Sequence, residues 1–283
     1  MKIDKILFIS DSNINYLSFW NSISKYYKKR FNLDSKLFFI GEKTSENEQF
    51  LSEEWGEVEV VKPLENVPII IQSLWGKFWF TQTEPDTNWL IGDIDLYLLN
   101  KEYFEYCMSI IPDGTYAHIN ANGYKDGNWW ERPLTGIPGY FHCGPGKKFK
   151  EYLELSDSFE EDCLYIYNSK KYGILYNGLI QHEDQAPQRV KDKKEFGFIC
   201  CEENLTTERL KRHKDQITSI TYPTNLVRVE TPYALHGQAT PEDFDFVHIF
   251  NPTHKNFYID FHAPRPYTVF GDRIEKILDY YYE

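Results

Sequence analysis

The fold is decided near the start of the chain, where residues 5–13 read KILFISDSN. The first six residues of this run predict a buried strand, and the Asp-Ser-Asn after them is typical of turns and helix caps. Residues 16–30 (YLSFWNSISKYYKKR) place apolar side chains at helical spacing, with Lys and Arg in the last turn, where the helix dipole favours them. Residues 36–40 (KLFFI) predict the next strand. A strand–helix–strand opening predicts an α/β fold with a mostly parallel sheet covered by helices.

The rest of the chain continues this alternation. Apolar patterning predicts strands at 58–61 and 88–95 and helices at 67–80, 101–111 and 272–280. The charged residues at 189–195 and 202–214 are typical of a solvated surface. No repeat and no Pro- or Gly-rich linker divides the sequence, which therefore predicts a single domain over residues 1–283.

Length and composition describe an ordinary globular protein. The chain has 283 residues, of which 41% are hydrophobic and 26% charged, and this balance excludes a mainly disordered chain. No stretch approaches the ~20 apolar residues that a membrane span needs, and the first ten residues are too short and too charged for a signal peptide. The five cysteines are an odd number without C-x-x-C spacing, which fits a reducing compartment. We therefore expect a cytoplasmic protein.

The charge of the chain limits its partners. The formal net charge is −12, from 43 Asp and Glu against 31 Lys and Arg. Because binding to a phosphate backbone depends on clustered Lys and Arg, this charge argues against nucleic acid as a partner. A small phosphorylated ligand would need a local positive charge, which a bound metal ion supplies.

Two acids, Asp93 and Asp95, interrupt the apolar run NWLIGDIDLYLL. Two carboxylates two residues apart at the end of a strand suit one hard cation and the phosphates bound to it, and Mg²⁺ and Mn²⁺ prefer such oxygen ligands. In open α/β sheets the ligand lies beyond the carboxyl ends of strands, where Asp11 and Asn13 also fall. A solvated strand end is the alternative. A phosphohydrolase with a D-x-D nucleophile is a second alternative, but such enzymes normally carry the motif on the first strand.

Two further groups of residues carry candidate chemistry. Glu183 and Asp184, in QHEDQ, include a candidate general base or mark an ordinary helix N-terminus, which acids also favour. In YIDFHAPRP at 258–266 a strand leads to His262, which suits a metal, and to Arg265, which suits a carboxylate or phosphate. A histidine with a purely structural role is the alternative at this position.

Glycines and aromatic residues indicate a further part of a site. The run GYFHCGPGKKF at 139–149 joins a predicted strand to a helix through glycines, which allow close approach to a ligand or form an ordinary turn. Its spacing matches neither a Walker loop nor a dinucleotide fingerprint. Aromatic residues make up 17% of the chain, and most are expected in the core. Residues such as Trp129, Trp130 and Tyr140 also suit stacking on sugar rings or bases, with loop anchors in the core as the alternative for the two tryptophans.

Taken in order, these motifs resemble nucleotide-sugar-dependent glycosyltransferases of the GT-A fold, close to small enzymes found in large DNA viruses and bacteria. The resemblance runs over most of the chain and is carried by SDSN at 10–13 with Tyr16, WLIGDIDL at 89–96, HCGPGKKF at 142–149, the Glu183–Asp184 pair and IDFHAPRP at 259–266. It implies a Rossmann-related, mixed and mostly parallel central sheet flanked by helices. It also implies a nucleotide-binding half at about 1–100 and an acceptor and catalytic half at about 101–283, located in the host cytoplasm if the chain is viral.

The same resemblance implies a site for the donor. Asp95 would be the more direct ligand of a divalent metal, usually Mn²⁺ with Mg²⁺ as the other candidate, which bridges the donor diphosphate. Asp93 would reach the ribose or the sugar, and His262 would complete the metal site. The other residues implied in binding are Ser10, Asp11, Asn13 and Lys77 for the nucleotide, and His142, Gly144, Trp129, Trp130 and Arg265 for the donor sugar or the acceptor.

The Glu183–Asp184 pair resembles the acidic pair of inverting members such as beta-1,4-galactosyltransferases. This implies that Asp184 removes the proton of the acceptor hydroxyl, while Glu183 holds a sugar hydroxyl. Relatives of the viral type carry the two acids in the opposite order, so the division of labour between them is open. The predicted function is metal-dependent transfer of a hexosyl or deoxyhexosyl group from a nucleotide-diphosphate sugar to a glycan hydroxyl. A UDP-sugar is the expected donor. A retaining transferase and a non-catalytic sugar- or nucleotide-binding module on the same fold are the alternatives.

Overall fold

The computed structural model describes residues 1–119, 139–168, 201–220, 227–230 and 258–282. The chain divides into two compact units, each assembled from separate stretches. Unit 1 consists of Met1–Val61, Gly92–Ile111 and Tyr222–Glu283, and unit 2 of Lys62–Ile91 and Pro112–Thr221. The nucleotide-binding half and the acceptor half remain predictions, because packing alone defines these units.

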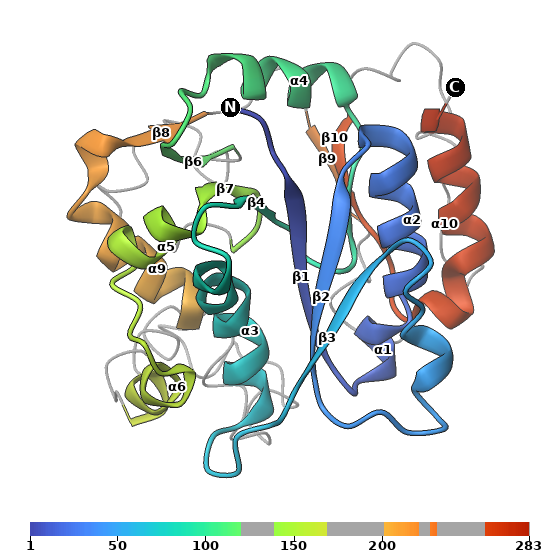
Figure 1. Ribbon diagram of the computed structural model, residues 1–283. Coiled ribbons are helices and arrows are strands. Elements are labelled where there is room, and N and C mark those ends of the chain that lie inside the picture. Colours follow the sequence, from blue (N-terminus) through green and yellow to red (C-terminus); the bar gives the residue numbers. More distant parts are fainter. Residues whose placement is uncertain (120–138, 169–200, 221–226, 231–257, 283) are drawn as a thin grey trace, which may run out of the picture. The chain divides into compact units, whose positions relative to one another are not determined.

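Unit 1 contains the three strands expected from the beginning of the sequence (Figure 1). Strands β1 (Lys5–Asp11), β2 (Asp34–Ile40) and β3 (Gly56–Val61) are parallel neighbours in the order β3-β2-β1. β2 is buried along nearly its whole length, as strands of a covered parallel sheet are. The strand–helix–strand opening is therefore confirmed.

The connection between β1 and β2 holds two helices where the sequence predicts one. These are α1 (Ile14–Leu17) and α2 (Trp20–Phe31), and the chain changes direction between them. At the break Phe19 is fully buried, with its ring centroid 5.5 Å from that of Tyr267. A continuous helical period cannot reveal this break, because both helices present apolar residues to the same core.

A second sheet of unit 1 is short and joins distant parts of the chain. Its strands are β5 (Leu96–Leu98), β9 (Val227–Glu230) and β10 (Tyr258–His262), in the order β5-β10-β9. β10 runs antiparallel to β5 and parallel to β9. This sheet places the end of β10 beside the start of β5.

Two longer helices complete unit 1, namely α4 (Lys101–Ile110) and α10 (Tyr267–Tyr282). α10 begins five residues before the predicted start, directly after Pro266, whose fixed backbone suits a helix beginning. α10 lies beside α2 (Figure 1), and the Ser22 hydroxyl of α2 donates a hydrogen bond of 2.6 Å to Glu275 Oε1 of α10.

Buried tyrosines of α2 hold β5 in place. The Tyr26 hydroxyl donates to the Leu98 carbonyl at 2.7 Å, and the Tyr27 hydroxyl donates to the Leu96 carbonyl at 3.2 Å and accepts from the Leu98 amide at 3.2 Å. Burial raises the pKa of Tyr27 far above its ordinary value, so the hydroxyl keeps its proton. The expectation that many aromatic residues form the core is confirmed here.

Unit 2 is built on a mixed sheet of four strands. They are β4 (Asn88–Ile91), β6 (Tyr116–His118), β7 (His142–Pro145) and β8 (Ile217–Ser219), in the order β4-β7-β6-β8. β7 is antiparallel to both of its neighbours, and β8 is parallel to β6.

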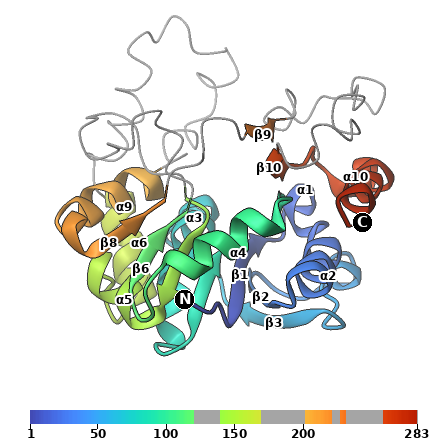
Figure 2. The same cartoon turned by 90° about the horizontal axis from the view of Figure 1, so that it is seen from above.

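The described helices of unit 2 gather around α3 (Ile69–Trp79), which begins after Pro68. α5 (Gly146–Tyr152), α6 (Phe159–Asn168) and α9 (Cys201–Lys211) all contact α3, as Figure 2 shows from above. Short 3₁₀ helices in the two units cover Glu48–Phe50, Phe80–Thr83 and Lys214–Gln216. The predicted α/β class, with a mixed and mostly parallel sheet flanked by helices, is confirmed.

The expectation that residues 202–214 form a solvated surface is wrong for α9. Glu202 is 3% exposed and Arg209 is 8% exposed. The Arg209 guanidinium lies over the Trp75 ring, 5.3 Å from its centroid, and Nη1 donates a hydrogen bond to the Leu153 carbonyl. The long stem of arginine lets its charged end reach such partners from a buried position.

Two further features of the described residues concern the state of the cysteines and the length and polarity of the helices. Cys107, Cys143 and Cys163 are buried free thiols, and burial raises the pKa of Cys107 to about 11. Within the described ranges, the helices all lack the combination of length and apolar character that a membrane crossing requires.

Candidate functional site

The two acids of the D-x-D motif lie in a turn directly before β5. The sequence predicts a strand through Asp95, but β4 ends at Ile91. The Leu96 amide donates to the Asp93 carbonyl at 3.0 Å, and this bond closes the turn. A turn at this point separates the two carboxylates from the regular ladder of the sheet.

Gly92 fixes this turn beside β1. Its amide donates to the Leu7 carbonyl at 3.1 Å, and a Cβ at this position would lie 2.7 Å from Cε1 of the buried Phe8 ring. Glycine is required here because any side chain would force the turn away from β1. Packing against β1 therefore sets where both acids stand.

Pairing of β5 with β10 brings His262 to Asp95. The register places His262 opposite Leu96, and the Ala263 amide donates to the Asp95 carbonyl at 2.8 Å. His262 Nε2 consequently lies 3.3 Å from Asp95 Oδ2. Two motifs that lie far apart in the sequence thus form one cluster in unit 1.

Asp95 is a buried carboxylate held by His262 and Arg265. The residue is 3% exposed, and its Oδ2 lies 2.6 Å from Arg265 Nε as well as near His262. Burial alone would raise the pKa of Asp95, but the charges of His262 and Arg265 outweigh burial and hold that pKa well below its usual range. The carboxylate is therefore ionised at neutral pH.

Arg265 is itself fixed on Tyr16. Its guanidinium lies over the Tyr16 ring, 4.6 Å from the centroid, and Nη1 donates a hydrogen bond to the Tyr16 hydroxyl. Nη2 also lies 3.1 Å from His262 Nε2. The sequence predicts a carboxylate or phosphate partner for Arg265, and the carboxylate of Asp95 is the partner in this structure.

Tyr16 is the residue to which sequence reasoning gave no role. Burial raises its pKa, Arg265 lowers it, and the negative charges of Asp95, Asp93 and Asp11 raise it further. All three acids therefore lie near enough to Tyr16 to raise its pKa. Tyr16 belongs to the motif at 10–16 that carries the family resemblance, but that motif assigns it no contact.

The residues after β1 are engaged locally. The Asn13 side chain caps α1 by accepting from the Asn15 amide at 3.1 Å, and Asp11 Oδ1 accepts from the Asn13 amide at 2.8 Å. The buried Ser10 hydroxyl donates to the Asp11 carbonyl at 3.0 Å. These bonds account for the cap that the sequence predicts, and the nucleotide-binding role of Ser10, Asp11 and Asn13 stays a prediction.

The donor set of the cluster fits the implied metal by its chemistry. Two carboxylates and one imidazole suit Mn²⁺ or Mg²⁺, and Asp95 Oδ2 is buried without a hydrogen bond of ordinary geometry. Among the described residues, however, three or more acidic, His or Cys side chains never converge in a metal-holding arrangement. Asp95 and His262 are together, Asp93 is close enough to influence Tyr16, and the Arg265 guanidinium contacts both Asp95 and His262.

Lys77, predicted to meet the nucleotide, lies inside unit 2. It is 4% exposed, and its Nζ is 3.4 Å from Glu202 Oε1. Gly139 packs so closely on this ammonium group that a Cβ there would lie 2.5 Å from Nζ. The pair links α3 to the start of α9, which gives Lys77 a structural role, while its nucleotide contact stays a prediction.

His142 and Gly144 are also buried in unit 2. The Tyr116 hydroxyl shares a hydrogen bond of 2.7 Å with His142 Nδ1, and the His142 side chain is fully enclosed. Gly144 has a φ of 148°, and a Cβ there would lie 2.6 Å from the Thr115 carbonyl oxygen. Packing explains both residues in this structure, and their contact with the donor sugar stays a prediction.

His118 makes stability depend on pH. Its ring centroid lies 4.4 Å from that of His142, and burial lowers the pKa of His118 to about 3, against a weaker opposite effect of the Tyr140 backbone. Because the unfolded histidine takes up a proton near its model value of 6.5 and the folded one does not, stability is complete above pH 6.5 and falls as the pH drops toward 3.

We expect His118 to contribute up to about 1.4 kcal/mol of lost stability per pH unit in this window. Urea unfolding of the chain and of His118→Asn at several pH values would measure it. The variant should show a shallower fall of unfolding free energy below pH 6.5. Parallel pH dependences of the two proteins would contradict the assignment.

Four predicted site residues lie outside the described residues. These are the acids Glu183 and Asp184 and the tryptophans Trp129 and Trp130. Tyr140 is described and half-buried, with its ring edge-on to Phe141 at 5.4 Å. The catalytic pair and the stacking platform therefore remain predictions.

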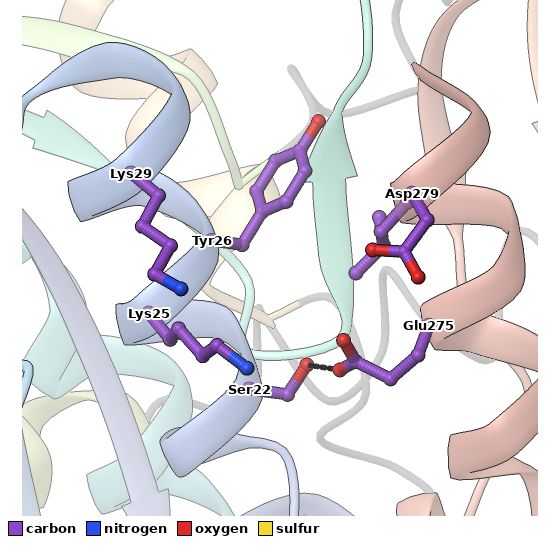
Figure 3. Close-up of a pocket in the computed structure, with 7 residues that line it drawn as sticks. Ser22, Lys25, Tyr26, Lys29, Glu275 and Asp279 are labelled. Atoms are coloured by element: carbon purple, nitrogen blue, oxygen red, sulfur yellow. Dashed lines mark hydrogen bonds between the residues drawn. The ribbon is translucent and has the colours of Figure 1, made fainter. Parts of the chain in front are cut away.

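A separate cavity of about 170 Å³ lies between α2 and α10 (Figure 3). Lys25 and Lys29 line one side, Glu275 and Asp279 line the other, and the Ser22–Glu275 hydrogen bond closes its base. None of the predicted site residues lines this cavity. The residues that line it carry charges of both signs and include no buried cation, so they do not indicate a particular ligand.

Comparison with known proteins gives a likeness of fold. No protein-family model matches the chain, and no curated protein matches it. Among solved structures, the galactosyltransferase LgtC in complex with donor and acceptor sugar analogues is 10% identical, with a TM-score of 0.46, over 97% of this chain and 95% of LgtC.

Two further solved structures are similar at the same level. The glycosyltransferase GlyE of Streptococcus pneumoniae TIGR4 is 12% identical with a TM-score of 0.43, over 78% of this chain and 45% of GlyE. Mouse xyloside xylosyltransferase 1 is 12% identical with a TM-score of 0.35, over 93% of this chain and 98% of that protein. All three are glycosyltransferases, the class that the sequence motifs resemble. At such scores the likeness transfers neither substrate nor residue roles to this chain.

Proposed function

We propose that the chain is a glycosyltransferase that moves a hexosyl or deoxyhexosyl group from a nucleotide-diphosphate sugar to a hydroxyl of a glycan acceptor. A UDP-sugar is the first candidate for this donor. The observation that carries this proposal is the cluster of Asp95, His262 and Arg265, with Asp93 and Asp11 near enough to raise the pKa of the neighbouring Tyr16. It combines ligands for a hard cation with a guanidinium suited to phosphate. A chain of net charge −12 needs such a local arrangement to bind a diphosphate.

Asp95, Asp93 and His262 are the residues that would hold the metal. Bound Mn²⁺ or Mg²⁺ would supply positive charge to the departing diphosphate. The low pKa of Asp95 supports this role, because an already ionised carboxylate has no proton to release before it binds a cation. The turn at Gly92 keeps Asp93 and Asp95 in position, and the β5–β10 pairing keeps His262 beside Asp95.

The acceptor chemistry is proposed for Glu183 and Asp184. The acceptor oxygen forms a bond to the anomeric carbon while the bond from that carbon to the diphosphate oxygen breaks. The bonding electrons leave with the nucleoside diphosphate, and the proton of the hydroxyl passes to the Asp184 carboxylate. Attack from the face opposite the leaving group inverts the anomeric carbon. Glu183 would hold a sugar hydroxyl during this step.

The free thiols Cys107, Cys143 and Cys163 support a reducing compartment, so we place the reaction in the cytoplasm. The acidic charge supports partners other than nucleic acid. The donor and the glycan acceptor are therefore the partners that we propose.

A panel of nucleotide sugars tests the proposed function. With Mn²⁺, at least one UDP-, GDP- or dTDP-sugar is expected to be hydrolysed slowly or transferred to added sugars, and EDTA should abolish this turnover. Release of the nucleoside diphosphate and mass spectrometry of the product would measure it. Absence of turnover with every donor, despite donor binding, would leave the non-catalytic binding module.

The stereochemistry separates the two transferase mechanisms. NMR of the product should show an anomeric configuration opposite to that of the donor. Net retention would remove Asp184 from the role of base and favour the retaining alternative.

A further inference from the structure

The Arg265 side chain lies against the atoms that a metal ion would use. Arg265 Nε is 2.6 Å from Asp95 Oδ2, and Nη2 is 3.1 Å from His262 Nε2. His262 Nε2 and Asp95 Oδ2 are themselves 3.3 Å apart. The guanidinium therefore contacts both members of the pair at their ligating atoms.

A guanidinium and a divalent cation cannot share these atoms. Mg²⁺ bonds carboxylate oxygens at about 2.0–2.1 Å, so an ion on Asp95 Oδ2 would stand within a few Å of the arginine charge. In this site, which is largely shielded from water, the two positive charges repel each other strongly. A metal ion on Asp95 and His262 requires the guanidinium to move.

Tyr16 holds the Arg265 guanidinium in its position beside Asp95. The cation lies on the Tyr16 ring at 4.6 Å, and the Tyr16 hydroxyl accepts a hydrogen bond from Nη1. The Arg265 side chain is 14% exposed, so part of it already reaches solvent. A diphosphate that arrives with the metal offers the displaced guanidinium a bidentate anionic partner.

We propose that Arg265 is a built-in competitor of the metal, which occupies Asp95 and His262 until a diphosphate draws it away. This proposal rests on the proposed function, because it takes the donor diphosphate as the group that receives the arginine. Metal and nucleoside diphosphate then bind cooperatively, since each favours the state in which Arg265 has left Asp95. Arg265 acts as a positioning residue that couples the two ligands.

Direct binding of Mn²⁺ tests this coupling without any transfer of sugar. Electron paramagnetic resonance of free Mn²⁺ gives the affinity of the protein alone and with UDP, after correction for Mn²⁺ bound by UDP in solution. We expect UDP to tighten Mn²⁺ binding to the unaltered chain about 10-fold or more. In Arg265→Gln, Mn²⁺ alone should bind about 10-fold more tightly than to the unaltered chain, and the effect of UDP should shrink.

Two other variants complete the experiment, one as a control and one as a second test. Lys276→Gln removes one positive charge from an exposed position of α10 and should leave Mn²⁺ affinity unchanged. Tyr16→Phe keeps the Asp95–Arg265 pair but removes the hydroxyl that holds Arg265, so it should tighten Mn²⁺ binding by a smaller factor. Circular dichroism of each variant checks folding. If Arg265→Gln does not fold, the Mn²⁺ affinity of Tyr16→Phe tests the proposal in its place.

Unchanged or weaker Mn²⁺ binding in both site variants would overturn the competition, and so would a chain that binds no Mn²⁺ in any form. The proposed function would fail separately. A chain that transfers sugar but shows no effect of Arg265→Gln keeps its function and loses the competitor. A chain with the expected Mn²⁺ affinities but no turnover keeps the competitor and loses the transferase function.

Discussion

Asp95→Asn is expected to lower the rate of sugar transfer by about 10²–10³-fold, as removal of a charge-stabilising group from an active site commonly does. The carboxamide has nearly the same shape but no charge. It binds a divalent cation more weakly than a carboxylate does, and it leaves His262 and Arg265 without the anion that they share in this structure. Initial rates at saturating donor and Mn²⁺ would measure the loss, together with Mn²⁺ affinity.

Asp272→Asn is the matched control for this experiment. Asp272 lies exposed on α10, so its replacement should leave the rate unchanged. Because loss of a buried charge also affects folding, thermal unfolding of Asp95→Asn should accompany the rates. A folded Asp95→Asn variant that retains half or more of the wild-type rate would remove Asp95 from the metal site.

Lys77→Met is expected to lower the free energy of unfolding by about 3–5 kcal/mol. The reason is the burial of both partners, since Lys77 is 4% and Glu202 3% exposed, with Nζ and Oε1 3.4 Å apart. Removal of the ammonium leaves a carboxylate in an environment that water barely reaches. Urea unfolding followed by circular dichroism would give the difference.

Two comparisons separate this pair from an ordinary ion pair. The double variant Lys77→Met/Glu202→Gln should lose less stability than the sum of its single variants, because no lone charge remains. Lys147→Met breaks the exposed pair with Asp86, whose atoms are 2.8 Å apart, and should cost less than about 1 kcal/mol. Equal losses for Lys77→Met and Lys147→Met would mean that water reaches Lys77, and a nucleotide contact would then be open to it.

The resemblance already implies that Asp93, Asp95 and His262 serve one site, but the strand pairing that brings Asp95 and His262 together could not be predicted from the sequence. Asp93, Asp95 and His262 stand out because polar residues interrupt apolar strands. Their meeting depends on the register of β5 with β10, and β5 has three residues, too few for any pattern to specify a partner. The tyrosine hydroxyls of α2 that fix β5 carry no mark in the sequence that distinguishes them from other core tyrosines.

Burial of charge was the other feature beyond the reach of the sequence. Lys77 and Glu202 are ordinary surface residue types, and nothing local indicates that α3 and α9 enclose them. The strand and helix predictions succeeded because they rest on periodicities of the backbone itself. Their errors fall where the chain turns, after Leu17 and after Ile91.

The division of unit 1 among separate stretches has a consequence for synthesis on the ribosome. Asp95 leaves the exit tunnel well before β10, Arg265 and α10, which belong to a later stretch of unit 1. Until that stretch arrives, the Asp95 carboxylate has neither of its cationic neighbours, and the edge of β5 is without β10. A nascent chain stalled before β10 would therefore carry Asp93 and Asp95 but no assembled centre, which can form only after β10 and Arg265 have been made.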